Sequence, residues 1–556
     1  MPDLKQTLLS QDLGYLRIVA ELWGLEVNIS DARSGVDLLT PLLLEQSLVK
    51  EMVEALPAEA EAALQTLLEN EGRLQWAVFT RRFGEVREMG AGRRDRKRPF
   101  ENPISPAEIL WYRALIGRAF FETTENPQEF AYVPIDLIPL LPEARMKTPV
   151  SFGRPASRDE IDKLVPANDH ILDHACTLLA AMRIGLPLEQ LTFDNIPSNL
   201  HTPYPISPQT LRQLLFAAGL ISMDGQPKPE ETRLFLDSGR GDSLAALAQA
   251  WIHNDTLNEL SLLPGLQLEG EWANDPLKTR TKILGFLSSI PSGNWWSMHG
   301  FITSVYHHYP DYQRPAGDYD SWFIRNQETG EYLRGFSHWD EIDGVLLRYL
   351  IAGPMHWLGM VDLSVQPDRK NDDGIMATAF RLSSWSDALL NGRVPTKISE
   401  EKAKILVTSD GRIHVPRLAP RVARYQIARF CEWGKNENDI YINKLTPNSL
   451  SRARNQGLNS SQLVALLHRY SPATPPNLVK AMEAWEKFGT QAQLEQLLVL
   501  RLKSPQILQD LRNTQAARFL GEPLGPTAVI VKPGAWEKVV RALIEMGCLT
   551  EIQEQL

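Results

Sequence analysis

Cysteine is scarce in this sequence, which has only three cysteines in 556 residues: Cys176, Cys431 and Cys548. They lie far apart, and none belongs to a CxxC pair. This spacing indicates neither a disulfide framework nor a thiolate metal site. Because free cysteine behaves as a small apolar residue, we expect three buried free thiols.

Long apolar runs are also absent. No stretch of about eighteen uncharged apolar residues occurs, as a membrane-spanning helix would require. The N-terminal sequence MPDLKQTLLSQDLGYL lacks the basic and then apolar order of a secretory signal. The sequence therefore predicts a cytoplasmic protein with no membrane partner.

The sequence contains no G-x-x-x-x-G-K-[ST] loop, the motif that holds nucleotide phosphates in helicase motors. The acidic run Asp340-Glu341-Ile342-Asp343 follows Ser-His-Trp and not an apolar strand, so we interpret it as a solvated helix N-terminus. Neither a complete dinucleotide fingerprint nor a G-x-S-x-G elbow occurs. We expect no catalytic residues, no cofactor and no ATP-driven motor in this chain.

Two further patterns have a functional and a structural interpretation. His170 and His174 are one helical turn apart and could chelate zinc, but no further ligand or catalytic glutamate accompanies them. We therefore interpret them as a helix-surface pair and predict no metal. The aromatic region from Trp295 to Trp357 could stack bases of a single strand. Its helical and alternating spacing favours core packing instead.

What is present is the composition of a folded soluble protein. Hydrophobic residues make up 43% and charged residues 23%, which argues against disorder. At this length several domains are expected. The chain repeats an order of helices followed by a helix that runs into a short strand, which predicts a mainly α fold with small β hairpins. We expect tandem winged-helix-like units at 1–150, 151–270 and 271–400, followed by an α/β domain at 401–556.

The first unit shows the pattern most clearly. Ser105-Pro106-Ala107-Glu108 has an N-cap serine, a proline at the first helical position and a glutamate that could close a capping box. This helix is expected to be the third of the unit. The β-prone runs AFFETT and EFAYVP follow it, joined by Glu125-Asn126-Pro127-Gln128. They predict a hairpin wing.

The net charge of -10 is distributed unevenly. Residues 1–71 have an excess of acidic side chains, whereas basic side chains dominate 81–98 and 402–435. Phosphates are bound by local patches, so these runs are candidate nucleic-acid contacts despite the total charge. The candidate residues are Arg93, Arg94, Arg96, Lys97 and Arg98 in a predicted loop before the third helix, Arg113 near the end of that helix, and Arg421 and Arg424 on one side of a later helix. A solvated loop and a plain amphipathic helix are the alternatives.

The last domain contains three distinctive segments: ILVTSDGRIHVPRLAP, KLTPNSLSRARNQGLNSSQLVALLHRYS and PPNLVKAMEAWEKFG. Together they resemble the N-terminal domain of XPB-type helicases. The earlier segments FGEVREMG, LWYRALI, GNWWSMHGF and DYDSWFIR resemble the companion region of bacterial proteins that have this domain without a motor. In XPB-type helicases the domain is a non-catalytic regulatory and protein-contact module, so the resemblance implies binding and not chemistry.

Two hypotheses follow from these observations. In the first, the protein is a non-catalytic DNA-associated adaptor or regulator in repair or transcription, which contacts phosphates and recruits a separately encoded helicase or nuclease. In the second, it is a protein-interaction scaffold whose winged-helix units do not bind DNA, as the acidic N-terminal region and negative net charge permit. A metal-dependent hydrolase that uses His170 and His174 would need a bound metal.

Overall fold

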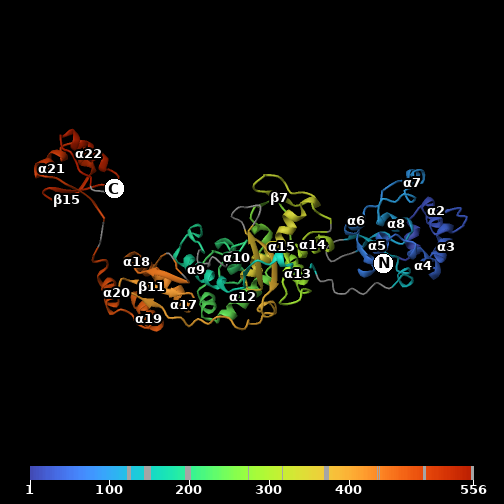
Figure 1. The fold of residues 1–556 in the computed structure, drawn as a ribbon, viewed down its shortest axis with the longest axis horizontal. Coiled ribbons are helices and arrows are strands. Elements are labelled where there is room, and N and C mark those ends of the chain that lie inside the picture. Colours follow the sequence, from blue (N-terminus) through green and yellow to red (C-terminus); the bar gives the residue numbers. More distant parts are fainter. Residues whose placement is uncertain are drawn as a thin grey trace. The chain divides into compact units, whose positions relative to one another are not determined.

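The computed structural model describes residues 1–121, 127–142, 152–193, 202–272, 274–315, 317–367, 375–434, 436–437, 439–492 and 496–552 (Figure 1). The chain forms two compact regions. The first comprises Met1–Leu458 and Gln462–Thr474, and the second comprises Asn459–Ser461 and Pro475–Leu556. Each region is described by itself below. No helix among these residues is long and apolar enough to cross a membrane.

The first region begins with five helices around one hydrophobic core. Aspartates at the N-caps of the first three helices, Asp3, Asp12 and Asp31, accept hydrogen bonds from backbone amides of the first turn, which satisfies donors that have no partner within the helix. The five helices are α1 (Leu4–Leu9), α2 (Leu13–Leu22), α3 (Ala32–Leu43), α4 (Gln46–Glu54) and α5 (Ala58–Glu69).

A small antiparallel sheet of order β1-β3-β2 completes this part. Its elements are β1 (Arg73–Gln75), α6 (Trp76–Phe83), α7 (Ala91–Lys97), α8 (Pro106–Tyr112), β2 (Gly117–Phe121) and β3 (Gln128–Tyr132). The hydroxyl of Ser105 caps α8 as expected. The carboxylate of Glu108 accepts from the amide of Ile104 and not from that of Ser105, so the predicted capping box does not form. The expected hairpin is present, but part of its turn lies outside the described residues.

A larger core occupies the middle of the first region and extends from Val165 to Ala428. Its helices are α9 (His170–Ile184), α10 (Pro208–Ala217), α11 (Pro229–Asp237), α12 (Arg240–His253), α13 (Pro276–Leu287), α14 (Met298–His308), α15 (Val345–Leu350) and α16 (Ser386–Leu390). A four-stranded sheet of order β4-β8-β9-β6 and a two-stranded sheet β5-β7 pack with them. These strands are β4 (Lys163–Val165), β5 (Leu266–Glu269), β6 (Trp296–Ser297), β7 (Phe323–Asn326), β8 (Val361–Pro367) and β9 (Ile375–Leu382).

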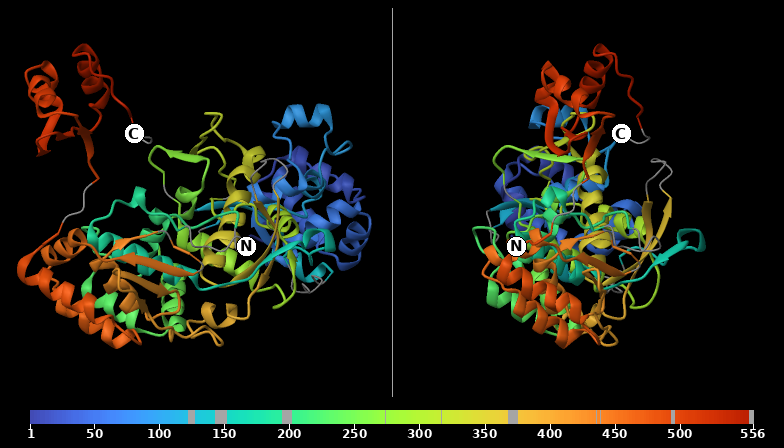
Figure 2. Two further views of the ribbon diagram at one scale, coloured as in Figure 1. Left: turned by 60° about the vertical axis from the view of Figure 1, so that its left-hand side comes forward. Right: turned by 90° about the vertical axis from the view of Figure 1, so that its left-hand side faces the viewer.

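The first region ends with a four-stranded sheet of order β10-β11-β13-β12. Gly411 has a φ of 83°, which suits the tight turn between β10 and β11 that Asp410-Gly411 predicts. Helix α17 lies beside α9 (Figure 1, Figure 2). The elements are β10 (Leu406–Val407), β11 (Arg412–Pro416), α17 (Arg421–Phe430), β12 (Glu432–Trp433), β13 (Ile440–Lys444) and α18 (Pro447–Asn455), followed by α19 (Ser460–Tyr470).

The second region has its own small core and a three-stranded sheet of order β14-β16-β15. Its elements are α20 (Pro476–Phe488), β14 (Leu498–Arg501), α21 (Pro505–Arg512), β15 (Leu520–Gly525), β16 (Ala528–Val531) and α22 (Trp536–Glu545). The apolar, β-branched segment AVIV forms β16. Gly547, with a φ of 81°, lies just beyond the end of α22.

The described residues combine helices with small antiparallel sheets, and helix exceeds strand, so the coarse fold expectation is confirmed. The finer organisation as tandem winged-helix-like units stays a prediction. So does the division at residues 150, 270 and 400, although one hydrophobic core contains residues from both sides of 270 and of 400. Cys176 and Cys431 are buried free thiols, as expected, and Cys548 is half-buried.

Candidate functional site

The helix α9 carries two carboxylates that the sequence did not single out. Asp169 is its N-cap residue and Asp173 lies in its first turn. Both are buried. Buried carboxylates need charged or hydrogen-bonding partners, because removal from water penalises the ionised form. Here the partners are arginines of α12 and of the segment around α17.

These side chains form what we call the arginine cluster. It consists of Asp169, Asp173, Arg240, Glu401, Arg417, Arg421 and Arg424. Four arginines meet three carboxylates in it. Its members come from 169 to 424 in the sequence, so the cluster joins the segment from Glu401 to Arg424 to helices α9 and α12.

Three guanidinium groups lie within ion-pair distance of Asp173. Nη2 of Arg240 lies 2.8 Å from one carboxylate oxygen, and Nη1 of Arg424 lies 3.1 Å from the other. Nη1 of Arg417 lies 3.0 Å from Asp173. Burial by itself raises the pKa of Asp173, but the charges of Arg424 and Arg240 outweigh it and hold the pKa well below its usual range. Asp173 is therefore a permanent anion at the centre of the cluster.

This arrangement changes the interpretation of the second basic run. The side chains of Arg421 and Arg424 are 0% and 4% exposed, so the expectation that they form an exposed helix face is wrong. Arg421 binds Glu401 at 2.6 Å, and Arg424 donates to the carbonyl of Asp173 at 2.6 Å. Neither guanidinium is placed to meet a phosphate from solvent. Whether either residue contributes to DNA binding stays untested.

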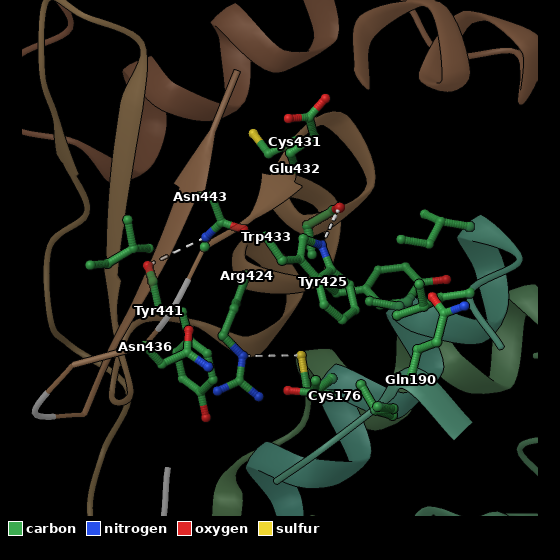
Figure 3. Close-up of a pocket in the computed structure, with 18 of the residues that line it drawn as sticks. Cys176, Gln190, Arg424, Tyr425, Cys431, Glu432, Trp433, Asn436, Tyr441 and Asn443 are labelled. Atoms are coloured by element: carbon green, nitrogen blue, oxygen red, sulfur yellow. Dashed lines mark hydrogen bonds between the residues drawn. The ribbon is translucent and has the colours of Figure 1, made fainter. Parts of the chain in front are cut away.

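A cavity of about 520 Å³ lies beside the cluster, between α9 and the segment from α17 to β13 (Figure 3). Arg424 points from α17 toward Cys176 of α9, and its Nε donates to Sγ at 3.4 Å. Tyr425, Trp433 and Tyr441 add aromatic rings to the lining. The lining thus combines ring faces with polar groups, as ligand sites commonly do.

The two cysteines of this cavity are not activated. Burial raises the pKa of Cys176, and burial raises the pKa of Cys431 to about 12. Both remain neutral thiols near pH 7, whereas a nucleophilic cysteine needs a lowered pKa. The cavity is therefore suited to binding and not to covalent catalysis by either cysteine.

The first basic run forms a short helix and not the predicted loop. Arg94 is buried on α7, with its guanidinium 2.7 Å from Asp12 and 2.8 Å from Asp95. Arg98 pairs with Glu21 and Glu101 at 2.8 and 3.0 Å. Of the five predicted phosphate contacts on this run, Arg94 is thus committed to an internal pair.

The remaining basic residues of α7 face solvent. Arg93, Arg96 and Lys97 are exposed, and Arg96 donates from Nε to the carbonyl of Gly92 at 2.9 Å. Arg113 follows α8, is half-buried and donates to the carbonyl of Ile109. In the part of the chain that the structure describes, neither Arg93 nor Lys97 has a carboxylate partner.

Within the histidine pair, His170 is half-buried, and only His174 departs clearly from the expected place on the helix surface. His174 is buried, its ring lies 4.5 Å from that of Phe193, and its Nε2 has no hydrogen-bond partner among the described residues. Burial lowers the pKa of His174 to about 3. No group of three or more potential ligands in the described chain is placed to hold a metal ion.

Two other sequence interpretations have mixed outcomes. In the acidic run, Asp340 and Glu341 are exposed, but Asp343 is buried and binds Arg314 at 3.1 Å. The interpretation of this run as a solvated helix N-terminus is therefore wrong for Asp343. In the aromatic region, most rings pack in the core, including Trp296, Trp322 and Trp339, whereas Tyr309 is 45% exposed.

The sequence did contain one signal for the missed cluster. The segment HILDHACTLLAAMRI is apolar around Asp173, and a carboxylate in such a helix requires a buried cation. No local pattern identifies that cation, because Arg240 is 67 residues away and Arg424 is 251 residues away.

Comparison with known proteins relates part of the chain to helicases. A family model described as "Helicase conserved C-terminal domain" matches residues 405–523. A DNA 3'-5' helicase XPB of Kineococcus radiotolerans is 31% identical over 152 residues, which cover 26% of this chain and 27% of that protein. The chain thus matches about a quarter of the length of this curated relative. The matched segment is helicase-related.

Proposed function

We propose that this protein is a non-catalytic, helicase-associated adaptor that contacts DNA phosphates through the exposed face of α7. The observation that carries the proposal is a contrast within α7. Arg94 is buried and paired with Asp12 and Asp95, whereas Arg93, Arg96 and Lys97 are exposed. Exposed basic side chains on an anchored helix can neutralise phosphates without an ordering step for the backbone.

The topology around α7 supports this proposal. The order β1-α6-α7-α8-β2-β3 with sheet order β1-β3-β2 supports the proposal of a winged-helix-like unit, in which the last helix would enter a DNA groove. Here, however, every residue of α8 is buried or half-buried. The proposed contact therefore uses phosphates and carries little sequence preference.

The lack of a phosphate-binding loop supports the adaptor role. The sequence has no G-x-x-x-x-G-K-[ST] motif, and the two buried cysteines of the cavity are inert thiols. We propose that the helicase-related segment serves as a contact for a separately encoded helicase or nuclease in the cytoplasm. The arginine cluster supports this by holding the start of that segment rigidly against α9.

The test measures duplex affinity of the full chain by fluorescence anisotropy across a salt series. The variant is Arg93→Gln, Arg96→Gln and Lys97→Gln combined. The control combines Lys50→Gln, Arg233→Gln and Arg393→Gln, which neutralise three exposed charges elsewhere. We expect the α7 variant to bind about tenfold more weakly, with a log–log salt slope shallower by about 0.9 for each phosphate that is no longer neutralised.

Equal affinity and equal slope for the two triple variants would overturn the α7 contact. If the wild-type chain binds no duplex at low salt, the second hypothesis, a scaffold that does not touch DNA, replaces the adaptor. DNA-stimulated ATP hydrolysis by the purified chain would contradict the non-catalytic part of the proposal.

A further inference from the structure

A second surface of the first region combines aromatic and basic side chains. It is a groove of about 730 Å³ between the α5–α6 segment and the segment of α13 and α14. We call it the aromatic groove. The lining residues that the argument uses are Arg82, Phe152, Phe286, His308, Tyr309 and Phe336.

One arginine fixes the two walls of this groove relative to each other. Nη1 of Arg81 lies 3.0 Å from both carboxylate oxygens of Asp311. The same guanidinium lies 5.0 Å from the ring centroid of Tyr319 and 4.9 Å from that of Phe336. A paired guanidinium against ring faces is a strong, specific contact. Arg81 also neutralises the negative charge of Asp311, which would otherwise repel an anionic ligand.

The groove contains a rigid aromatic platform. The ring centroid of Phe286 lies 4.6 Å from that of Phe152 and 5.3 Å from that of Tyr309, and Phe152 and Tyr309 are 5.5 Å apart. Tyr309 nevertheless remains 45% exposed. An aromatic side chain held by two buried or half-buried rings has little conformational entropy left to lose when a ligand stacks on it.

Guanidinium and imidazole side chains at the groove can donate hydrogen bonds to an anion. Arg82 is exposed one residue after the Arg81 anchor, and His307 and His308 are exposed at the end of α14. Nδ1 of His308 is directed to the carbonyl of Ser304 at 2.8 Å. The one opposing charge that is not neutralised within the described lining is Glu69, which lies on α5.

We propose that the aromatic groove binds single-stranded nucleic acid, with a base stacked on Tyr309 and the backbone phosphates near Arg82 and the two histidines. This combination of ring faces and basic side chains is how proteins bind single strands without reading sequence. A duplex keeps its bases stacked inside, so it cannot offer a base face to Tyr309. The proposal rests on the proposed DNA association but uses a different surface from α7.

The experiment compares three fluorescein-labelled probes on the full chain: an oligothymidylate of about twelve nucleotides, an abasic strand of equal length, and a duplex. We expect Tyr309→Ala to weaken binding of the oligothymidylate about tenfold and to leave duplex affinity unchanged. Tyr309→Phe keeps the ring and should bind normally. The matched control is Tyr332→Ala, because Tyr332 is 42% exposed outside the groove lining.

A second measurement does not depend on any variant folding. An oligonucleotide with 5-iodouracil is photo-crosslinked to the wild-type chain, and the crosslinked peptide is expected to contain Tyr306 to Tyr309. Crosslinks confined to other peptides overturn the proposal. So does equal binding of the abasic strand and the oligothymidylate, and so does equal competition by an acidic peptide such as polyglutamate.

The failure of this proposal can be told apart from the failure of the α7 contact. Loss of duplex binding in the α7 triple variant, with single-strand binding insensitive to Tyr309→Ala, supports α7 and rejects the groove. Tyr309-dependent single-strand binding without any duplex binding supports the groove and rejects α7. A wild-type chain that binds neither probe rejects both.

Discussion

Helices α7 and α17 each carry several arginines, but they use them differently. On α17, Arg421 and Arg424 are buried among carboxylates from distant parts of the chain. On α7, only Arg94 is buried, and its neighbours Arg93, Arg96 and Lys97 are exposed. Basic residues are denser on α7, with four in seven residues, than on α17, with three in ten, so density does not decide which of them are buried. What differs is whether carboxylates of the fold are positioned to receive them.

The comparison separates two roles of arginine. A guanidinium taken out of water needs carboxylates or other acceptors at fixed positions, so it favours one packing arrangement of the chain. An exposed guanidinium contributes little to stability and is free to meet an external anion. Variants of the two helices should therefore change different measurements, and their effects should differ in size.

The largest expected effect is on the arginine cluster. Asp173→Asn removes the anion that Arg240, Arg417 and Arg424 share, which leaves buried positive charges uncompensated. We expect a loss of roughly 3–5 kcal/mol in the free energy of unfolding, measured by urea denaturation. The control is Asp237→Asn, whose carboxylate is 48% exposed and 3.6 Å from Arg233. A similar small loss for both variants would contradict the central role of Asp173.

The next effect compares neighbouring residues of α7. Arg94→Met removes the guanidinium that donates to both Asp12 and Asp95, and Asp12 also caps α2. We expect a loss of about 2 kcal/mol in the free energy of unfolding. Arg93→Met, at the adjacent exposed position, should leave it unchanged. Denaturation of the two variants in parallel tests this, and equal losses would show that α7 is not anchored through Arg94.

A smaller effect concerns pH and His174. Burial lowers its pKa to about 3, whereas in an unfolded chain it is about 6.5. As the pH falls below about 6.5, the unfolded chain binds a proton that the folded protein does not. Stability should therefore fall toward acid pH, by at most about 1.4 kcal/mol per pH unit for this group.

His174→Phe removes this titration and keeps an aromatic ring beside Phe193. The midpoint of urea denaturation should then depend less on pH between 6.5 and 5 than in the wild type. The matched control is His253→Phe, because His253 is exposed at the end of α12. An unchanged pH dependence in the His174 variant would show that His174 is not buried as a neutral ring.

Local signals allowed much of the fold to be predicted. The helix after Ser105 begins where its N-cap and proline place it, and α20 likewise begins with a proline in its first turn. The turn at Gly411 follows from backbone geometry alone. These features depend on residues within a few positions of one another.

Long-range partners could not be predicted in the same way. GAGRRDRKRP contains two glycines and a dense charge run, which are typical of a loop, yet it contains α7 because Arg94 meets Asp12, 82 residues away. Burial of Arg421 depends on Glu401 and on Ser243, 178 residues away. The DNA contacts that we still propose, Arg93, Arg96 and Lys97, are those with no carboxylate partner among the described residues.

The smallest expected effect concerns Arg98, which lies between the two classes. Its side chain is 46% exposed, and it pairs with Glu21 and Glu101, which are 55% and 48% exposed. Exposed pairs of this kind contribute ~0–1 kcal/mol, so Arg98→Gln should barely change the urea midpoint. Because two carboxylates already compete for its guanidinium, it should also lower duplex affinity less than Arg93→Gln does. The same anisotropy titration measures both variants. If Arg98→Gln weakens binding as much as Arg93→Gln, exposure alone and not the absence of a carboxylate partner decides which arginines of α7 meet phosphates.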